Sequence, residues 1–238
     1  MLGLPDGITA CLFDLDGVLT KTAEVHAHAW KQTFDAFLKT RGQPPFDLVH
    51  DYDEYVDGKP RLDGVRDFLA SRGIELPEGS PDDPPDAETI QGLANAKNAL
   101  VLRLIREDGV EAYEGSVRYL HAARDAGLRR AVVSSSHNCH DVLVAAGIED
   151  LLEVRVDGVV AEKRRLRGKP APDTFLEAAR MLGVAPEHAA VFEDALAGVQ
   201  AGREGGFGHV VGVDRAGQRE ALLAHGASVV VGDLAELL

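Results

Sequence analysis

ITACLFDLDGVLT, residues 8–20, joins a short apolar run to two closely spaced carboxylates, Asp14 and Asp16. The run from Ile8 to Phe13 has the length and composition of a buried strand. Side chains two residues apart on an extended chain point to the same side, so Asp14 and Asp16 can face one pocket where the strand ends. Open parallel sheets bind their ligands at that carboxyl end. The segment therefore predicts a strand that leads into a reactive site.

The Asp pair limits the chemistry of this site, because two neighbouring carboxylates repel each other and need a cation or a shared proton. With Mg²⁺ as the cation, Asp14 can attack phosphorus while Asp16 exchanges a proton with the leaving or accepting oxygen. A simple turn and a calcium loop are the alternatives. An EF-hand loop beginning at Asp14 needs Glu at its twelfth position, where this chain has Val25. The pair favours phosphoryl transfer through an aspartyl phosphate.

The composition is that of an ordinary globular protein, with 45% of its 238 residues hydrophobic and 27% charged. A chain of this length can bury a sizeable core, as one large domain or as a domain with an inserted cap. The formal net charge is −14, from 25 Lys and Arg against 39 Asp and Glu, so the overall field repels nucleic acid and anionic membranes. We therefore expect neither as a partner.

Cysteine usage and hydropathy indicate the compartment. The two cysteines, Cys11 and Cys139, form no Cys-x-x-Cys motif, so we expect no structural disulfide. Cys139 beside His137 or His140 could be a nucleophile, although two polar residues at a helix start are more often bystanders. The sequence shows no signal-like segment and no apolar run near the roughly 20 residues that span a bilayer. We expect a cytoplasmic monomer.

Apolar runs alternate with helical patterns over most of the chain, which predicts an α/β fold with a parallel sheet and right-handed crossovers. The expected strands are 8–13, 128–133, 189–192, 209–213 and 228–231, and the expected helices between them are 116–126, 139–146, 173–182, 197–205 and 218–225.

A long helical interval separates the first two strands, from about Glu24 to Gly109. It far exceeds an ordinary connection between a strand and a helix, so we expect a separate helical cap domain over 24–109 and a core over 1–23 and 110–238. Within the cap, residues 76–86 are rich in Pro, Gly and acid, which predicts an exposed loop.

Three later segments supply what the Asp pair lacks. After the second strand, the hydroxyl and backbone N–H groups of SSSHN, residues 134–138, can bind phosphate oxygens, and the alternative is an ordinary helix cap. Lys169, in the proline-stiffened GKPAPD of residues 168–173, can neutralise a phosphoryl group and Asp14 unless it is a solvated surface lysine. A set of oxygen ligands suited to Mg²⁺ can be formed by Asp14, by Asp194 and by the backbone carbonyl of Asp16, with Glu193 as a further candidate. The alternative for Glu193 and Asp194 is an acidic cap of the next helix.

These four segments, in this order, resemble the signature of the haloacid dehalogenase superfamily of phosphotransferases and phosphatases. The resemblance covers nearly the whole chain and implies a Rossmann-like parallel-sheet core with a helical cap inserted after the first strand. It implies Asp14 as the nucleophile and Asp16 as the general acid and base. It also implies Ser134 and Lys169 as phosphate ligands, with Mg²⁺ bound on the side of Glu193 and Asp194.

The cap resembles that of the β-phosphoglucomutases within this superfamily. The segment TKTAEVHAHAWK, residues 20–31, is similar to their cap entry, and its Thr22, His26 and Trp30 recur on one helix face. Trp30 in the cap core and His26 as a hinge hydrogen bond are the alternatives. VDGKPR, residues 56–61, resembles the loop that binds the distal phosphate or sugar in that family, and Lys97-Asn98 resembles a Lys-Asn pair of the same cap. One departure is Asp57, where that family's pattern has Lys, so Lys59 takes over the charge or the distal group differs.

The resemblance implies a Mg²⁺-dependent β-phosphoglucomutase that interconverts β-glucose 1-phosphate and glucose 6-phosphate through β-glucose 1,6-bisphosphate. A sugar-phosphate phosphatase using the same core is the alternative, and a non-catalytic binding protein of this fold is the alternative from another class. The substrate-binding residues expected for the mutase are Thr22, His26, Gly58, Lys59, Arg61, Lys97, Ser135, Ser136, His137 and Asn138.

Overall fold

The computed structural model describes residues 2–238, which divide into two compact units. The core unit contains the residues up to Lys21 together with Val110–Leu238, and the cap unit contains Thr22–Gly109. The names core unit and cap unit refer only to these ranges. No helix among residues 2–238 is both long and apolar enough to cross a membrane.

Six parallel strands form the sheet of the core unit, in the spatial order β3-β2-β1-β4-β5-β6. Five of them lie within two residues of the strands predicted from the sequence. The sixth, β3, is a three-residue edge strand that was not predicted, because its central Arg155 interrupts the apolar pattern. The strands are β1 Ala10–Phe13, β2 Arg129–Val133, β3 Val154–Val156, β4 Ala189–Glu193, β5 His209–Val213 and β6 Val229–Val231.

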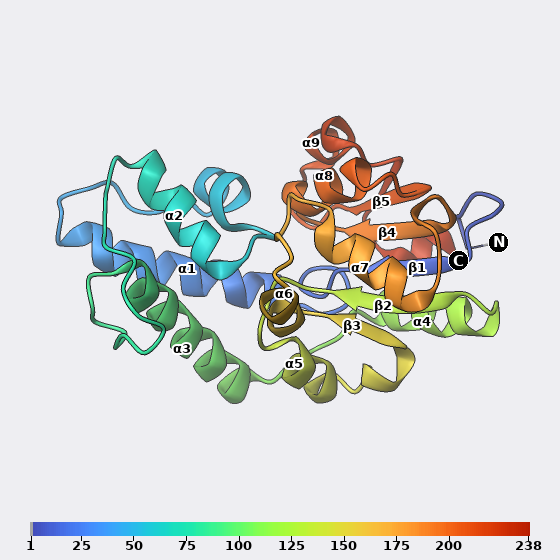
Figure 1. Cartoon of the computed structure of the whole chain (residues 1–238), viewed down its shortest axis with the longest axis horizontal. Coiled ribbons are helices and arrows are strands. Elements are labelled where there is room, and N and C mark those ends of the chain that lie inside the picture. Colours follow the sequence, from blue (N-terminus) through green and yellow to red (C-terminus); the bar gives the residue numbers. More distant parts are fainter. Residues whose placement is uncertain (1) are drawn as a thin grey trace. The chain divides into compact units, whose positions relative to one another are not determined.

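Helices cover both faces of this sheet (Figure 1). Phe175 and Leu182 of α7 pack in one buried cluster with Leu12 and Val191, on one face. On the other face, the ring of Tyr119 in α4 lies 6.1 Å from that of Phe13. The prediction of an α/β Rossmann-like core is confirmed. The helices are α4 Glu114–Asp125, α5 Cys139–Ala145, α6 Gly158–Arg164, α7 Asp173–Leu182, α8 Leu196–Glu204 and α9 Arg219–His225, with short 3₁₀ turns at Glu149–Leu151, Pro186–His188 and Leu234–Leu237.

The strand register brings the functional segments to one edge of the sheet. Phe13, the last residue of β1, pairs with Val132 on one side and Phe192 on the other. Because all three strands run in parallel, the residues that follow them emerge at the same carboxyl edge. The N–H of Asp14 continues the ladder by donating to the carbonyl of Phe192 at 2.9 Å.

The cap unit consists of three longer helices, a π-helical turn and an aromatic core. The ring of Phe34 lies 5.1 Å from that of Trp30, 5.3 Å from that of Phe46 and 4.1 Å from that of Phe68. Large aromatic rings bury enough apolar surface to give a unit of this size its own core. The elements are α1 Thr22–Lys39, the π-helical turn Tyr52–Val56, α2 Arg61–Ser71 and α3 Ile90–Asp108.

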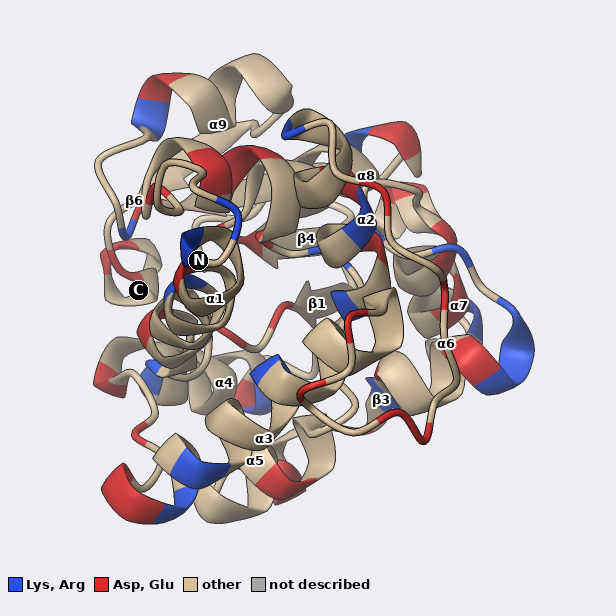
Figure 2. Cartoon of the chain, turned by 90° about the vertical axis from the view of Figure 1, so that its left-hand side faces the viewer, with Lys and Arg blue, Asp and Glu red and all other residues tan. Residues whose placement is uncertain are grey.

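The Pro-rich acidic segment of residues 76–86 is a largely exposed loop without helix or strand, as predicted. It is fixed to α3 by the side chain of Asn95, which donates to the carbonyls of Pro81 at 3.0 Å and Asp83 at 2.9 Å. Acidic residues are also spread over helices and loops elsewhere in the chain (Figure 2). The excess of negative charge is therefore distributed and is not confined to this loop.

Candidate active site

Lys169 is the shared counter-ion of two buried carboxylates at the carboxyl edge of the sheet. Its ammonium group donates to Asp14, to Oε1 of Glu193 at 2.5 Å and to the carbonyl of Val133 at 3.1 Å. The side chain of Lys169 is 1% exposed and that of Glu193 is fully buried. The ammonium also lies 4.9 Å from the centre of the Phe175 ring. The alternative of a solvated surface lysine is therefore wrong.

The chain before α7 explains why Lys169 reaches this position. Asp173, the first residue of α7, accepts from the backbone N–H of Arg167 at 3.2 Å and pairs with its guanidinium at 2.8 Å. The N–H of Ala171 donates to the carbonyl of Gly168 at 3.0 Å, which closes a turn around Lys169. The turn holds the backbone on either side of Lys169, so its long side chain is directed inward.

Burial and charge act in opposite directions on this group. Burial raises the pKa of Asp14 well above its ordinary range, Lys169 opposes this, and the neighbouring Glu193 and Asp16 carboxylates add to the rise. For Lys169, burial works against the charged form, but the attraction of Asp14 and Glu193 is larger and raises its pKa. The lysine therefore stays charged, while the negative charge of Asp14 depends on a cation nearby.

A group of three carboxylates could hold a divalent metal ion. One carboxylate oxygen from each of Asp14, Glu193 and Asp194 lies within 4.8 Å of the other two, and all three residues are buried. Hard oxygen donors of this kind suit Mg²⁺. The side chain of Asp16 is not part of this group, so its predicted role as a metal ligand depends on its backbone carbonyl.

The two oxygens of Glu193 already accept hydrogen bonds. Oε1 accepts from Lys169, and Oε2 accepts from the N–H of Ala195 at 2.9 Å. Gly198 lies so close that a Cβ there would be 1.8 Å from Oε1. These contacts fix Glu193 from three sides. Asp194 is 8% exposed and is the less buried residue of the pair.

The turn after β1 holds Asp16 and brings Gly17 against Asp194. The N–H of Gly17 donates to the carbonyl of Thr20 at 2.8 Å, and the hydroxyl of Ser116 donates to the carbonyl of Val18 at 2.6 Å. Gly17 has φ +83°, and a Cβ there would lie 1.7 Å from Oδ2 of Asp194. Only glycine fits this position.

The serine run follows β2 as predicted, and its hydroxyls shape the turn. Ser134 is buried, and its Oγ accepts from the N–H of Ser136 at 3.1 Å. Oγ of Ser136 accepts in turn from the N–H of Asn138 at 3.1 Å. Each hydroxyl keeps its own proton to donate to a ligand. The helix α5 that follows has only seven residues. The prediction of phosphate binding by this segment therefore depends on the turn more than on the start of the helix.

Comparison with known proteins identifies the family. The sequence profile described as haloacid dehalogenase-like hydrolase matches residues 8–206, which include Asp14, Lys169 and Asp194. The chain belongs to the haloacid dehalogenase-like hydrolase family. The expectation of an enzyme of this superfamily is thereby confirmed.

Individual members of the family resemble the chain over its whole length. It is 56% identical to Beta-phosphoglucomutase of Mycobacterium tuberculosis, covering 100% of this chain and 94% of that protein. It is 34% identical to Beta-phosphoglucomutase of Bacillus subtilis, over 96% of this chain and 91% of that protein. The crystal structure of beta-phosphoglucomutase from Clostridium difficile superimposes with a TM-score of 0.77 at 27% identity, covering 97% and 93% of the two chains.

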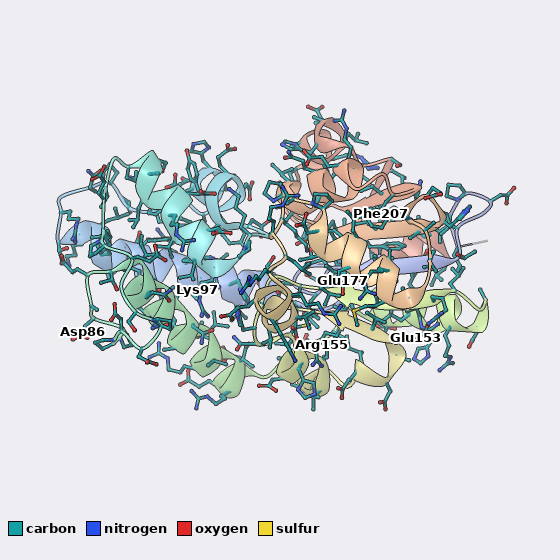
Figure 3. All side chains as sticks on the ribbon, viewed as in Figure 1. Asp86, Lys97, Glu153, Arg155, Glu177 and Phe207 are labelled. Carbon is teal, nitrogen blue, oxygen red and sulfur yellow. The ribbon has the colours of Figure 1, made fainter. Side chains whose placement is uncertain are left out.

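The cap unit of this protein contains another buried lysine, Lys97. Lys97 lies on α3 (Figure 3). Its Nζ lies 2.8 Å from Nδ1 of His26 and 4.7 Å from the centre of the Trp30 ring. Lys97 is 5% exposed, and Trp30 packs in the cap core. The alternative of Trp30 as a core residue is therefore confirmed. Thr22, at the start of α1, is also buried.

The two cationic side chains predicted for the loop before α2, Lys59 and Arg61, have different surroundings. Nζ of Lys59 pairs with Asp67 at 2.8 Å and donates to the carbonyl of Glu54 at 3.0 Å. No carboxylate in the described part of the chain pairs with Arg61, and its buried Nε has no hydrogen-bond partner there. Burial lowers the pKa of this guanidinium. Gly58, at φ +69°, provides the turn between Asp57 and Lys59.

Two polar residues near the site were missed by the sequence analysis. Arg215 donates to the carbonyl of Gly17, and Gln218 donates to the carbonyl of Asp194. Both lie in the loop after β5, beyond the residues matched by the family profile. The only signal that could have found them is their position directly after the carboxyl end of a strand.

Proposed function

We propose that this protein is a Mg²⁺-dependent β-phosphoglucomutase. It interconverts β-glucose 1-phosphate and glucose 6-phosphate through an aspartyl phosphate and β-glucose 1,6-bisphosphate. The observation that carries the proposal is the 56% identity over the whole chain to a protein of that activity, because it includes the cap as well as the core. The buried group of Asp14, Lys169 and Glu193 supports the phosphoryl-transfer chemistry.

Asp14 is the nucleophile in this proposal. One of its oxygens attacks the phosphorus of the donor phosphate, a new P–O bond forms, and the bond from phosphorus to the sugar oxygen breaks. Asp16 gives a proton to the departing sugar oxygen, and in the reverse half-reaction it takes the proton from the accepting hydroxyl. Lys169 offsets the negative charge of Asp14 and of the phosphoryl group as they approach.

Mg²⁺ would be held by Asp14, Asp194 and the backbone carbonyl of Asp16, with Glu193 beside them. The bound ion would supply charge neutralisation and polarisation of the phosphoryl oxygens. Ser134 would donate its hydroxyl proton to one of those oxygens. Ser135, Ser136, His137 and Asn138 remain proposed contacts of the sugar.

Arg61 is the proposed ligand of the phosphate that is not being transferred. Its guanidinium is partly buried without a carboxylate partner among residues 2–238, and a fork of N–H donors suits a phosphate. Lys59 is already paired with Asp67, so it is a weaker candidate for the charge that Asp57 does not provide. We also propose that the cap domain of residues 24–109 supplies His26, Lys97 and Gly58 to substrate binding.

A sugar-phosphate phosphatase is the second candidate, and Asp57 is the residue that favours it. A carboxylate beside Gly58 weakens the attraction of this loop for a second phosphate. The core chemistry is the same in both reactions up to the aspartyl phosphate, and they differ in whether water or a sugar hydroxyl then attacks phosphorus.

The deciding experiment follows two products in one tube. The purified protein receives β-glucose 1-phosphate, Mg²⁺ and a trace of β-glucose 1,6-bisphosphate, and both glucose 6-phosphate and free phosphate are measured. Glucose 6-phosphate without matching phosphate release supports the mutase. Phosphate release without glucose 6-phosphate contradicts it and supports the phosphatase. The Asp14→Asn variant is the blank, since it lacks the nucleophile and keeps the shape of the site.

The proposed setting is a cytoplasmic monomer that acts on a small sugar phosphate. Both cysteines, Cys11 and Cys139, are buried and unpaired, and burial raises the pKa of each thiol. Such thiols are poor nucleophiles. This argues against the alternative in which Cys139 is catalytic.

A further inference from the structure

The loop between β5 and α9, residues 214–218, contacts both acidic segments of the site. Nε of Arg215 donates to the carbonyl of Gly17 at 2.9 Å. Nε2 of Gln218 donates to the carbonyl of Asp194 at 3.1 Å. The family profile ends at residue 206, so neither contact belongs to the matched signature.

The guanidinium of Arg215 is held in one orientation. Its Nη1 donates to the carbonyl of Gly232 at 2.7 Å, and its Cζ lies 3.6 Å from the centre of the Tyr113 ring. A planar group stacked on an aromatic ring and bonded at two corners has little freedom to rotate. The carbonyl of Gly17 therefore accepts from a fixed donor.

The loop backbone is also fixed at both ends. Oδ1 of Asp214 accepts from the N–H of Gly217 at 2.7 Å and from the N–H of Gln218 at 2.8 Å. The N–H of Asp214 donates to the carbonyl of Val231 at 2.8 Å, which ties the loop to β6. Arg215 and Gln218 are thus two donors on one rigid loop.

The two carbonyls that this loop holds belong to residues in direct contact. A Cβ on Gly17 would lie 1.7 Å from Oδ2 of Asp194, so a small shift of either backbone moves the Asp194 carboxylate. The loop therefore adds a second constraint, besides the pairing of β1 with β4, on the distance between the turn after β1 and the acidic end of β4. That distance decides whether Asp14 and Asp194 can ligate one ion.

Both side chains leave a buried polar atom without a partner among the described residues, Nη2 of Arg215 and Oε1 of Gln218. An unpaired buried polar atom costs stability. Packing for stability alone favours replacing such side chains with apolar ones, so we attribute these residues to their contacts with the carbonyls of Gly17 and Asp194.

We propose that Arg215 and Gln218 are positioning residues for the divalent metal. This inference rests on the proposed function, which assigns Mg²⁺ to Asp14 and Asp194. Neither side chain contacts the ion in this proposal. They act by fixing the backbone of Gly17 and Asp194, as groups outside the ligand sphere commonly do for ligating side chains.

The test measures metal binding directly, with Mn²⁺ as the probe and electron paramagnetic resonance of the free ion as the readout. Arg215→Met and Gln218→Met each remove the donor and keep much of the side-chain volume. We expect each to raise the Kd for Mn²⁺ about 10-fold, the lower end of the usual effect of such groups. Arg219→Met is the matched control, because its guanidinium also donates to a backbone carbonyl, that of Val230 in β6 at 2.5 Å.

The outcomes separate this inference from the proposed function. Arg215→Lys keeps a donor without the planar fork, so its Kd should lie between those of the wild type and Arg215→Met. Kd values within twofold of wild type in both Met variants would overturn the inference and leave the metal assignment intact. A wild-type protein that binds no Mn²⁺ would contradict the metal assignment itself, and the inference with it.

A general loss of folding is distinguished by a second measurement. Thermal unfolding of each variant without metal shows whether the core is intact. Gln218→Met removes a single hydrogen bond, so it should unfold within a few degrees of the wild type and still bind Mn²⁺ more weakly. An equal weakening in Arg219→Met would mean that the effect is not specific to the loop, and would overturn the inference.

Discussion

Nζ of Lys169 lies 2.5 Å from Oε1 of Glu193, and the two side chains are 1% and 0% exposed. Lys169 also contacts Asp14, so one buried ammonium serves two buried carboxylates. A buried group of one ammonium and two carboxylates stabilises the fold only while all three charges are present, because each charge loses its hydration on burial. The arrangement makes Lys169 a structural as well as a chemical part of the site.

Replacing Lys169 with Met should destabilise the protein in a pH-dependent way. Asp14 and Glu193 stay buried and lose their counter-ion, so we expect the free energy of unfolding to fall by about 3 kcal/mol near neutral pH. Burial already raises the pKa of Asp14 in the folded protein, and in the variant Lys169 no longer opposes that rise. The folded state then holds this proton more tightly than the unfolded chain, so stability is lost as the pH rises and regained as it falls. Urea unfolding at about pH 5 and about pH 7.5 measures this.

The control for this variant is Lys21→Met, which removes another lysine and breaks its exposed pair with Glu111. An exposed pair contributes at most about 1 kcal/mol. A deficit in Lys169→Met that is equally large at both pH values would contradict the explanation from unpaired carboxylates.

Glu193 and Asp194 should have separable roles. Both oxygens of Glu193 already accept hydrogen bonds, from Lys169 and from the N–H of Ala195. We expect Glu193→Gln to lower kcat and to change the Kd for Mn²⁺ by less than about threefold, while Asp194→Asn raises that Kd by more than about 10-fold. Equilibrium metal binding and steady-state kinetics on the same preparations distinguish the two. Equal effects of both variants on Kd would make Glu193 a direct ligand.

Arg61→Ala should weaken substrate binding without weakening the fold. A charge-assisted contact to phosphate contributes about 1.5–3 kcal/mol, so kcat/KM should fall about 10- to 100-fold. Because no carboxylate among residues 2–238 pairs with Arg61, its removal leaves no buried charge behind, and Tm should stay equal or rise. Lys59→Ala is the matched control, since Lys59 is paired with Asp67. If Lys59→Ala lowers kcat/KM more than Arg61→Ala, the assignment of the distal phosphate is wrong.

Gly17→Ala should remove metal binding for a steric reason. The new Cβ would lie 1.7 Å from Oδ2 of Asp194, at φ +83°. Gly183→Ala is the matched control, because Gly183 has φ +71° and nothing within 4 Å of its Cβ position. Both variants should lose about 1–2 kcal/mol of stability from the left-handed backbone. Only Gly17→Ala should lose Mn²⁺ affinity, and an equal loss in both would refute the contact with Asp194.

Asp53 gives the cap unit its own pH dependence. Burial, together with nearby Asp47, raises the pKa of Asp53 to about 6, and His50 opposes the rise. The folded state therefore holds this proton more tightly than the unfolded chain, and stability is lost as the pH rises from about 4 through about 6. Asp53→Asn should stabilise the protein by about 1 kcal/mol at neutral pH, after a discount for partial exposure, and by nothing near pH 4. Denaturant unfolding at the two pH values tests this, and a gain at pH 4 as large as that at neutral pH would contradict it.

Much of the core could be predicted because its signals are local. The apolar runs marked β1, β2, β4, β5 and β6, since strands buried on both faces carry continuous hydrophobic residues. The edge strand β3 lacked that signal because Arg155 lies at its centre and only one neighbouring strand covers it. The positions of Asp14, Ser134, Lys169 and Asp194 in the sequence were sufficient for the resemblance, and the profile match confirmed the family.

The cap was harder to predict, because its residues divide between core and surface in ways that spacing does not reveal. Thr22, His26 and Trp30 share one helix face by sequence, yet Trp30 stacks on Phe34 at 5.1 Å in the cap core. Lys59 and Arg61 are two residues apart and carry the same charge, but among residues 2–238 only Lys59 pairs with a carboxylate, that of Asp67 on α2. Which cation is neutralised depends on side-chain packing across the cap.

The order of the reactive segments and the chemistry they can perform follow from the amino-acid sequence, because carboxylates, hydroxyls and a lysine after successive strands limit the possible reactions. How those charges combine depends on the three-dimensional fold. It buried Lys169 between Asp14 and Glu193, set Gly17 against Asp194, and brought Arg215 and Gln218 to the carbonyls of both acidic segments. Contacts between residues nearly 200 positions apart depend on strand order and register, which no local pattern in the sequence records.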